Sequence, residues 1–185
     1  MPIRIESASE EHLVGLCQAI EAVARERRYL GNVDGFPLDE VRQFASALAA
    51  GGGVQLVAVD DDGNVAGWCD IRRNPFEGFR HVGTLGVGLL SAYREQGLGP
   101  KLLARTIEAA ATAGMQRIEL EVFASNTRAV HVFEKAGFVR EGLKRRARLL
   151  DGADDDVVCM ALLLPAAEHG HSPAGRPTPP ARADA

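Results

Sequence analysis

The six residues from Arg94 to Gly99 join an apolar run, Leu85 to Leu90, to a stretch whose apolar residues have helical spacing. Two glycines one residue apart let the backbone of such a turn approach a ligand closely. The unpaired amides and the positive dipole end of the following helix favour phosphate oxygens. The segment therefore predicts an anion-binding turn between a strand and a helix, of a size that fits a pyrophosphate.

Two common nucleotide-binding motifs do not match this turn. The Rossmann fingerprint has three glycines and an acidic residue about twenty positions further on. A P-loop ends in Gly-Lys-Ser/Thr, which Lys101 and its neighbours do not complete. The turn thus predicts a different phosphate-bearing cofactor, and a turn that needs glycine only for its backbone conformation is the alternative.

Hydrophobic periodicity and helix-terminating residues predict a mixed α/β fold. The predicted helices cover residues 9–28, 37–50, 99–113 and 127–136. The predicted strands cover residues 3–5, 54–59, 65–71, 82–90 and 117–123, and a final hairpin over 139–164 turns at 151–152. Within that hairpin, the basic residues 144–148 face the acidic residues 154–156, which indicates cross-strand pairing.

Length and composition suit one domain, 1–165, followed by a tail, 166–185, whose prolines and alanines predict disorder. His169 and His171 lie in this tail and receive no role. A net charge of −4 argues against nucleic-acid binding. The apolar runs are too short to span a membrane, and no signal peptide is recognised, so we expect a cytoplasmic protein. Three isolated cysteines lack metal-ligand spacing, so no metal is expected.

Two sequence blocks together resemble the GNAT acetyltransferase superfamily. The first is the turn from Arg94 to Gly99, and the second runs from Leu120 to Asn126 and continues through Ala129 to the segment from Phe133 to Phe138. The resemblance implies a mixed, mostly antiparallel sheet flanked by helices, with a V-shaped splay between the two central strands. It also implies that acetyl-CoA is the cosubstrate and that the reaction is N-acetylation of a primary amine.

The resemblance assigns cofactor contacts to three segments. The turn would hold the diphosphate, the backbone of the central strand would pair with the pantetheine arm, and Asn126 would contact pantetheine or cap the helix that begins at Thr127. Gly86 and Gly88 are poor strand formers, which indicates either close approach of a ligand or a bulge. The implied cofactor-binding residues are Val87, Gly88, Leu89, Arg94, Glu95, Gln96, Gly97, Leu98, Gly99 and Asn126.

Glu121 is the first candidate for the general base. Strand alternation puts Glu119 and Glu121 on one face, and partial burial would raise the pKa of Glu121 toward the range of a general base. The resemblance to family members that acetylate protein N-termini also points to Glu121 as the proton acceptor. A solvated, paired carboxylate is the alternative, and Asp70 and His81 are reserve candidates.

Phe133 occupies the position where the family usually has a tyrosine that protonates the leaving thiolate, so this chain lacks that hydroxyl. Slower transfer and loss of turnover are both consistent with this change. Residues Arg28, Tyr29 and Phe36 are predicted to bind the acceptor, and the arginine favours a carboxylate-bearing amine such as an amino acid. A protein N-terminal acetyltransferase of the ribosomal-protein type and a non-catalytic acyl-CoA-binding protein are the alternatives. Whether the chain forms a homodimer is left open.

Overall fold

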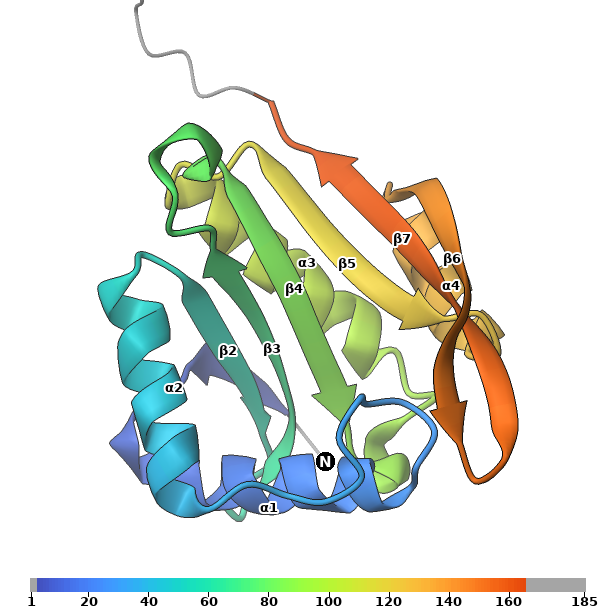
Figure 1. Cartoon of the computed structure of the whole chain (residues 1–185). Coiled ribbons are helices and arrows are strands. Elements are labelled where there is room, and N and C mark those ends of the chain that lie inside the picture. The colour runs from blue at the N-terminus through green and yellow to red at the C-terminus, as the bar shows by residue number, and fades with distance from the viewer. Residues whose placement is uncertain (1–2, 166–185) are drawn as a thin grey trace, which may run out of the picture.

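The computed structural model describes residues 3–165. In this part of the chain, seven strands form one sheet in the order β1-β2-β3-β4-β5-β7-β6, and four α-helices pack on it (Figure 1). The strands are β1 Arg4–Ser7, β2 Val54–Val59, β3 Val65–Arg73, β4 Val82–Leu89, β5 Arg117–Phe123, β6 Val139–Leu150 and β7 Ala153–Leu163. The helices are α1 Leu13–Arg25, α2 Leu38–Ala50, α3 Leu98–Thr112 and α4 Thr127–Lys135. This arrangement confirms the predicted mixed α/β class.

The helices form two layers, with α1 and α2 on one face of the sheet and α3 and α4 on the other (Figure 1). Each layer encloses its own hydrophobic cluster. Side chains along β3 alternate between them: Cys69 and Ile71 belong to the cluster beneath α3, whereas Trp68 belongs to the cluster beneath α1. With a period of two, Asp70 shares the face of Trp68.

The two central strands separate after a short parallel pairing. Residues Val82 to Thr84 of β4 pair with Arg117 to Glu119 of β5, and no pairing between these strands continues beyond Thr84 within the described chain. From there β4 stays paired with β3, while β5 stays paired with β7. The predicted V-shaped splay is therefore present, and it opens toward the carboxyl ends of β4 and β5 (Figure 1).

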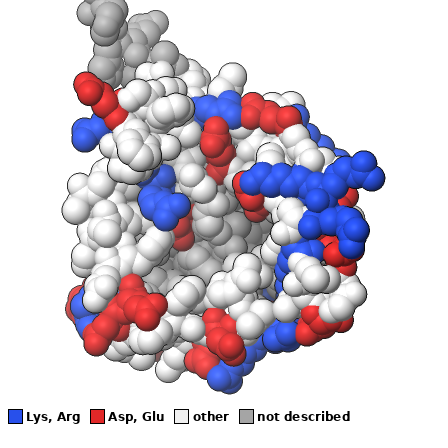
Figure 2. Space-filling view, in the orientation of Figure 1, with Lys and Arg blue, Asp and Glu red and all other residues white. Residues whose placement is uncertain are grey.

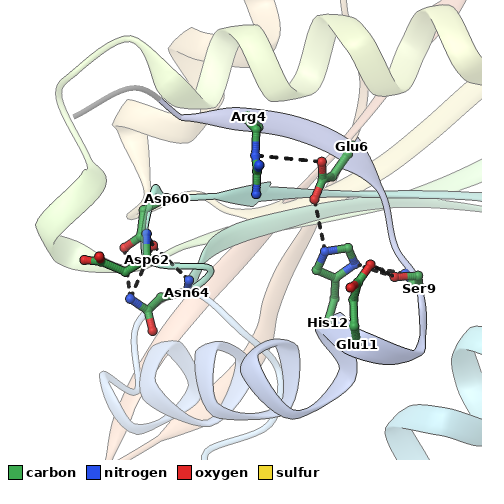
Figure 3. A network of polar contacts seen from close by, with 8 residues as sticks. All are labelled: Arg4, Glu6, Ser9, Glu11, His12, Asp60, Asp62 and Asn64. Atoms are coloured by element: carbon green, nitrogen blue, oxygen red, sulfur yellow. Dashed lines mark hydrogen bonds and ion pairs between the residues drawn. The ribbon is translucent and has the colours of Figure 1, made fainter.

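Several predicted boundaries shift at element ends. Residues 10–12 form a 3₁₀ turn before α1, which ends at Arg25 rather than near Arg28. The buried side chain of His12 stabilises the beginning of the 3₁₀ turn, because its Nδ1 accepts a hydrogen bond from the Ser9 amide at 3.1 Å (Figure 3). Its Nε2 lies 3.1 Å from a Glu6 carboxylate oxygen. These side-chain contacts tie β1 to the helix start.

The β6–β7 hairpin confirms the predicted cross-strand pairing. Arg146 forms an ion pair with Asp154 at 2.6 Å, and its amide donates a hydrogen bond to Asp156 at 2.7 Å. The hairpin turns at Asp151, whose carboxylate accepts hydrogen bonds from the Arg27 guanidinium at 2.6 and 2.9 Å. The hairpin tip is thereby attached to the loop that follows α1.

The predicted tail, 166–185, lies outside the described residues. Among residues 3–165, no helix combines the length and the apolarity that crossing a bilayer requires. The domain boundary at residue 165 stays a prediction.

Candidate active site

A cavity of about 510 Å³ lies where the end of β4 meets the N-termini of α3 and α4. Its lining draws on both helical layers, because Val23 belongs to α1 whereas Leu103 and Val132 belong to α3 and α4. The cavity therefore reaches through the gap between β4 and β5. The predicted site residues that line it are Arg28, Tyr29, Val87, Gly88, Leu89, Arg94, Glu95, Gly97, Gly99, Asn126 and Phe133.

The glycine turn is shaped by Gly97, which has φ 75° and ψ 4° and precedes the first residue of α3. This left-handed conformation favours glycine, and a Cβ added there would meet no atom within 4 Å. The helix α3 begins at Leu98, one residue before the predicted start, so Pro100 is its third residue. Its missing N–H is still one of the four that a helix start leaves unpaired. The cradle fits a bound phosphate group.

Backbone groups of β4 form the second wall. Beyond Thr84 this strand has no described partner on the β5 side, so an extended ligand arm fits beside it. Packing explains why residue 88 is a glycine, because a Cβ at this position would lie 2.2 Å from Cη2 of Trp68. Glycine therefore allows the indole to cover this part of the strand.

Arg94 holds the end of β4 to the end of α1. Its guanidinium donates to the Leu89 carbonyl at 2.7 and 2.9 Å and to a Glu26 carboxylate oxygen at 2.7 Å. The hydrogen bond with Glu26 raises the pKa of Arg94. The guanidinium carbon also lies 4.6 Å from the centre of the Tyr29 ring. In this state the side chain has protein partners, and a diphosphate contact stays a prediction.

Asn126 and Phe133 place α4 against the cavity. The Asn126 side-chain oxygen accepts a hydrogen bond from the Ala129 amide at 3.2 Å, so the predicted helix cap is present. Phe133 is 5% exposed and packs edge-to-face against Phe138, with ring centres 5.8 Å apart. The ring lines the cavity but carries no hydroxyl that would protonate a leaving group.

Glu121 does not line this cavity. Its side chain is 55% exposed and forms an ion pair with Lys144 of β6, and this ion pair raises the pKa of the lysine. Glu119, on the same face of β5, pairs with Arg117 at 2.6 Å. Glu121 is thus a solvent-exposed carboxylate in an ion pair, which was the alternative to a base, and its role as a base stays a prediction.

The two reserve candidates differ in burial. Asp70 is 8% exposed, and burial raises the pKa of its carboxyl to about 7, an effect that the charge of Arg72 partly offsets. His81 is exposed, and its backbone carbonyl accepts hydrogen bonds from the amides of Gln116 and Arg117. Of the two, only Asp70 is buried.

Like Glu121 and the two reserve candidates, three further predicted residues lie outside the cavity lining. The Gln96 side chain donates to the Ala92 carbonyl at 2.7 Å, Leu98 is buried in the core, and Phe36 is 43% exposed. Arg128 was not predicted as a site residue, but it lines the cavity and pairs with Glu95 at 2.7 Å. The sequence shows that Arg128 is close to Asn126 in the chain. It does not show that the N-termini of α3 and α4 lie side by side at the cavity.

The face that carries α1 and α2 is hollowed over the middle of the sheet (Figure 2). Acidic and basic side chains surround the hollow. The helices leave this part of the sheet uncovered, so a second molecule can reach the region where β4 and β5 separate.

The split sheet, the glycine turn at the start of α3 and the cavity through the gap are the features of a protein that can hold a phosphate-bearing ligand between its two central strands. Residues 18–138 match the model of the Acetyltransferase (GNAT) family, and the chain belongs to this family. It is an N-acetyltransferase.

Known proteins agree with this assignment. The uncharacterized N-acetyltransferase YdgE of Bacillus subtilis is 30% identical over 90 residues, and the match covers 49% of this chain but only 57% of YdgE. The L-amino acid N-acetyltransferase AaaT of Escherichia coli is 27% identical over 147 residues, which are 78% of this chain and 90% of AaaT. The fold is shared with YncA from Salmonella typhimurium, a putative acetyltransferase solved with acetyl-CoA, at a TM-score of 0.83. That structure is 22% identical, and the match covers 95% of this chain and 100% of YncA.

Proposed function

We propose that this chain transfers an acetyl group from acetyl-CoA to a primary amine of a small molecule, such as an amino acid. The observation that carries the proposal is the cavity that joins the glycine turn to the unpaired side of β4. A diphosphate at Gly97 and a pantetheine arm along Val87 to Leu89 would fill it. Its volume lies within the range of about 300–1,000 Å³ that is typical of small-molecule sites.

Acetyl-CoA supplies a reactive thioester, and the chain's own residues would orient it. Amides at the start of α3 would receive the phosphate oxygens, and the backbone of β4 would pair with the amide groups of the arm. Asn126 caps α4 beside the same cavity and so fixes the wall opposite β4. These groups preorganise the donor without a covalent enzyme intermediate.

The acceptor would enter from the loop after α1, where Arg28 and Tyr29 line the cavity. The Arg28 guanidinium carbon lies 5.8 Å from the centre of the Tyr29 ring, which positions a positive charge at this end. A positive charge at this place would bind the carboxylate of an acceptor that carries its carboxylate next to its amine. The named activity of AaaT on L-amino acids supports the same acceptor class.

The first experiment measures thermal unfolding with acetyl-CoA, free CoA, longer acyl-CoAs and NAD as a comparison. A ligand at one hundred times its Kd stabilises the folded state by about 2.7 kcal/mol. We expect CoA compounds to raise the melting temperature and NAD to leave it unchanged. No shift with any CoA compound would remove the basis of the proposal.

The second experiment measures thiol release with amino acids, polyamines and peptides that have free N-termini. Faster release with amino acids supports the proposed acceptor. Preference for peptides would favour the protein N-terminal alternative. CoA binding without release for any amine would favour the non-catalytic alternative.

A further inference from the structure

Asp70 stands out because it is a buried carboxylate that forms no ion pair with any residue of the part of the chain that the structure describes. It lies on β3 and is 8% exposed. Among residues 3–165, no hydrogen bond to its carboxylate is formed. Because no fully buried side-chain oxygen in this part of the chain lacks a partner, the Asp70 oxygens must retain a small exposed surface.

The Asp70 carboxylate borders a notch in β4. Asp70 is paired in register with Gly86, and a Cβ added to Gly86 would lie 3.3 Å from both carboxylate oxygens. Glycine therefore leaves space directly beside the carboxylate. An ammonium group is small enough to approach an oxygen there at the usual hydrogen-bond distance of about 2.8 Å.

The notch is close to the predicted path of the donor. Gly86 precedes the cavity-lining residue Gly88 by two positions, a separation of about 7 Å along a strand. Both residues lie beyond Thr84, where β4 has left β5. A thioester held against β4 from the α3 side would thus face an amine that arrives from the hollowed side.

The charges around Asp70 leave it the best placed acceptor of a proton. On its own strand Arg72 is the charged neighbour, and its register partners Gln55 and Gly86 on β2 and β4 are uncharged. The part of α1 that packs against β3 buries apolar residues. Across the gap, Glu119 and Glu121 on β5 are already paired with Arg117 and Lys144.

We infer that Asp70 is the catalytic base, which binds the acceptor's ammonium group at the Gly86 notch and removes a proton from it. This inference rests on the proposed acetyl transfer. The neutral amine then attacks the thioester carbonyl carbon, so a C–N bond forms and the C–S bond breaks. The second amine proton passes to the departing thiolate, and Asp70 returns its proton to water. The products are the acetamide and free CoA.

The burial of Asp70 suits this task. A buried carboxyl whose pKa is raised to about 7 is a stronger proton acceptor than an exposed aspartate. An approaching ammonium also supplies the positive charge that the ionised group lacks in the free protein. The exposed pair between Glu121 and Lys144 offers neither property.

The test compares Asp70→Asn with the unchanged chain and with Asp39→Asn, a matched control at a residue that is 83% exposed on α2. The acceptor is the amino acid with the fastest thiol release. Three quantities are measured: kcat and KM for the amine, both as functions of pH, and the thermal shift caused by CoA. The CoA shift shows that each variant is folded and binds the donor.

We expect Asp70→Asn to lower kcat by about 100-fold or more and to abolish the decline of kcat/KM below pH 7, with the CoA shift retained. Gly86→Ala should raise KM for the amine, because its methyl group fills the notch. A near-normal kcat with the same pH profile in Asp70→Asn would overturn the inference, as would a change in KM alone. If the unchanged chain binds no CoA or releases no thiol, the proposed function itself fails.

Discussion

Replacing Asp70 with asparagine should make the free protein more stable at neutral and alkaline pH. In the folded chain, burial raises the pKa of this carboxyl from 3.8 to about 7. The unfolded chain is therefore ionised between these values while the folded chain keeps its proton. Stability falls as the pH rises through this window, because the folded state binds more protons than the unfolded state.

The magnitude follows from the width of the window. A difference of about three pKa units at about 1.36 kcal/mol each corresponds to a loss of about 4 kcal/mol, complete above pH 7. Asparagine has no such loss. The asparagine amide changes the free energy of unfolding by an amount that does not depend on pH. The pH-dependent part of the stability difference therefore comes from the Asp70 carboxyl alone. For a chain of this size, 4 kcal/mol corresponds to a melting-temperature change of roughly 8–16 °C.

The assay is urea unfolding of both proteins at intervals from pH 4 to pH 8, without CoA. The stability difference between Asp70→Asn and the unchanged chain should grow steadily up to pH 7 and then level off. Asp39→Asn should differ from the unchanged chain by less than about 0.5 kcal/mol, as is usual for a surface position. A difference for Asp70→Asn that stays constant from pH 4 to pH 8 would refute the reasoning.

Three further substitutions test the site. Gly97→Ala should destabilise the chain by about 1–2 kcal/mol and weaken the thermal shift with CoA, because φ is 75° there while the space for a methyl group is open. Phe133→Tyr should raise kcat by up to about tenfold if protonation of the thiolate limits the rate; an unchanged kcat with retained CoA binding would show that it does not. Glu121→Gln should reduce kcat less than about tenfold and stability by less than about 1 kcal/mol, since its ion pair with Lys144 is exposed; a larger loss of kcat than that of Asp70→Asn would return the role of base to Glu121.

Local patterns were sufficient for most of the fold. The two-residue alternation over Arg117 to Phe123 correctly separates buried Ile118 and Leu120 from exposed Glu121. Gly97 and Gly114, at the two ends of α3, have positive φ values of 75° and 83°, a conformation that glycine adopts without steric cost. These features depend on neighbouring residues only, which is why a single sequence reveals them.

The environment of the candidate bases was not visible in the same way. Asp70 and Glu121 are both strand carboxylates, and a local pattern gives no reason to expect that one is buried and the other paired with Lys144. Likewise, nothing near Arg94 indicates that Glu26, far away in the chain, would accept its hydrogen bonds. These are long-range contacts that form when the sheet and helices pack.

The sequence by itself determined the anion-binding turn, the order of helices and strands, and the family resemblance, because turn conformation and periodicity are encoded within a few residues of one another. Only the tertiary structure decided which of the candidate acids is buried and which is paired with a lysine. A carboxylate's pKa depends on desolvation and on nearby charges, and both are set by residues that the folded chain brings together from distant positions.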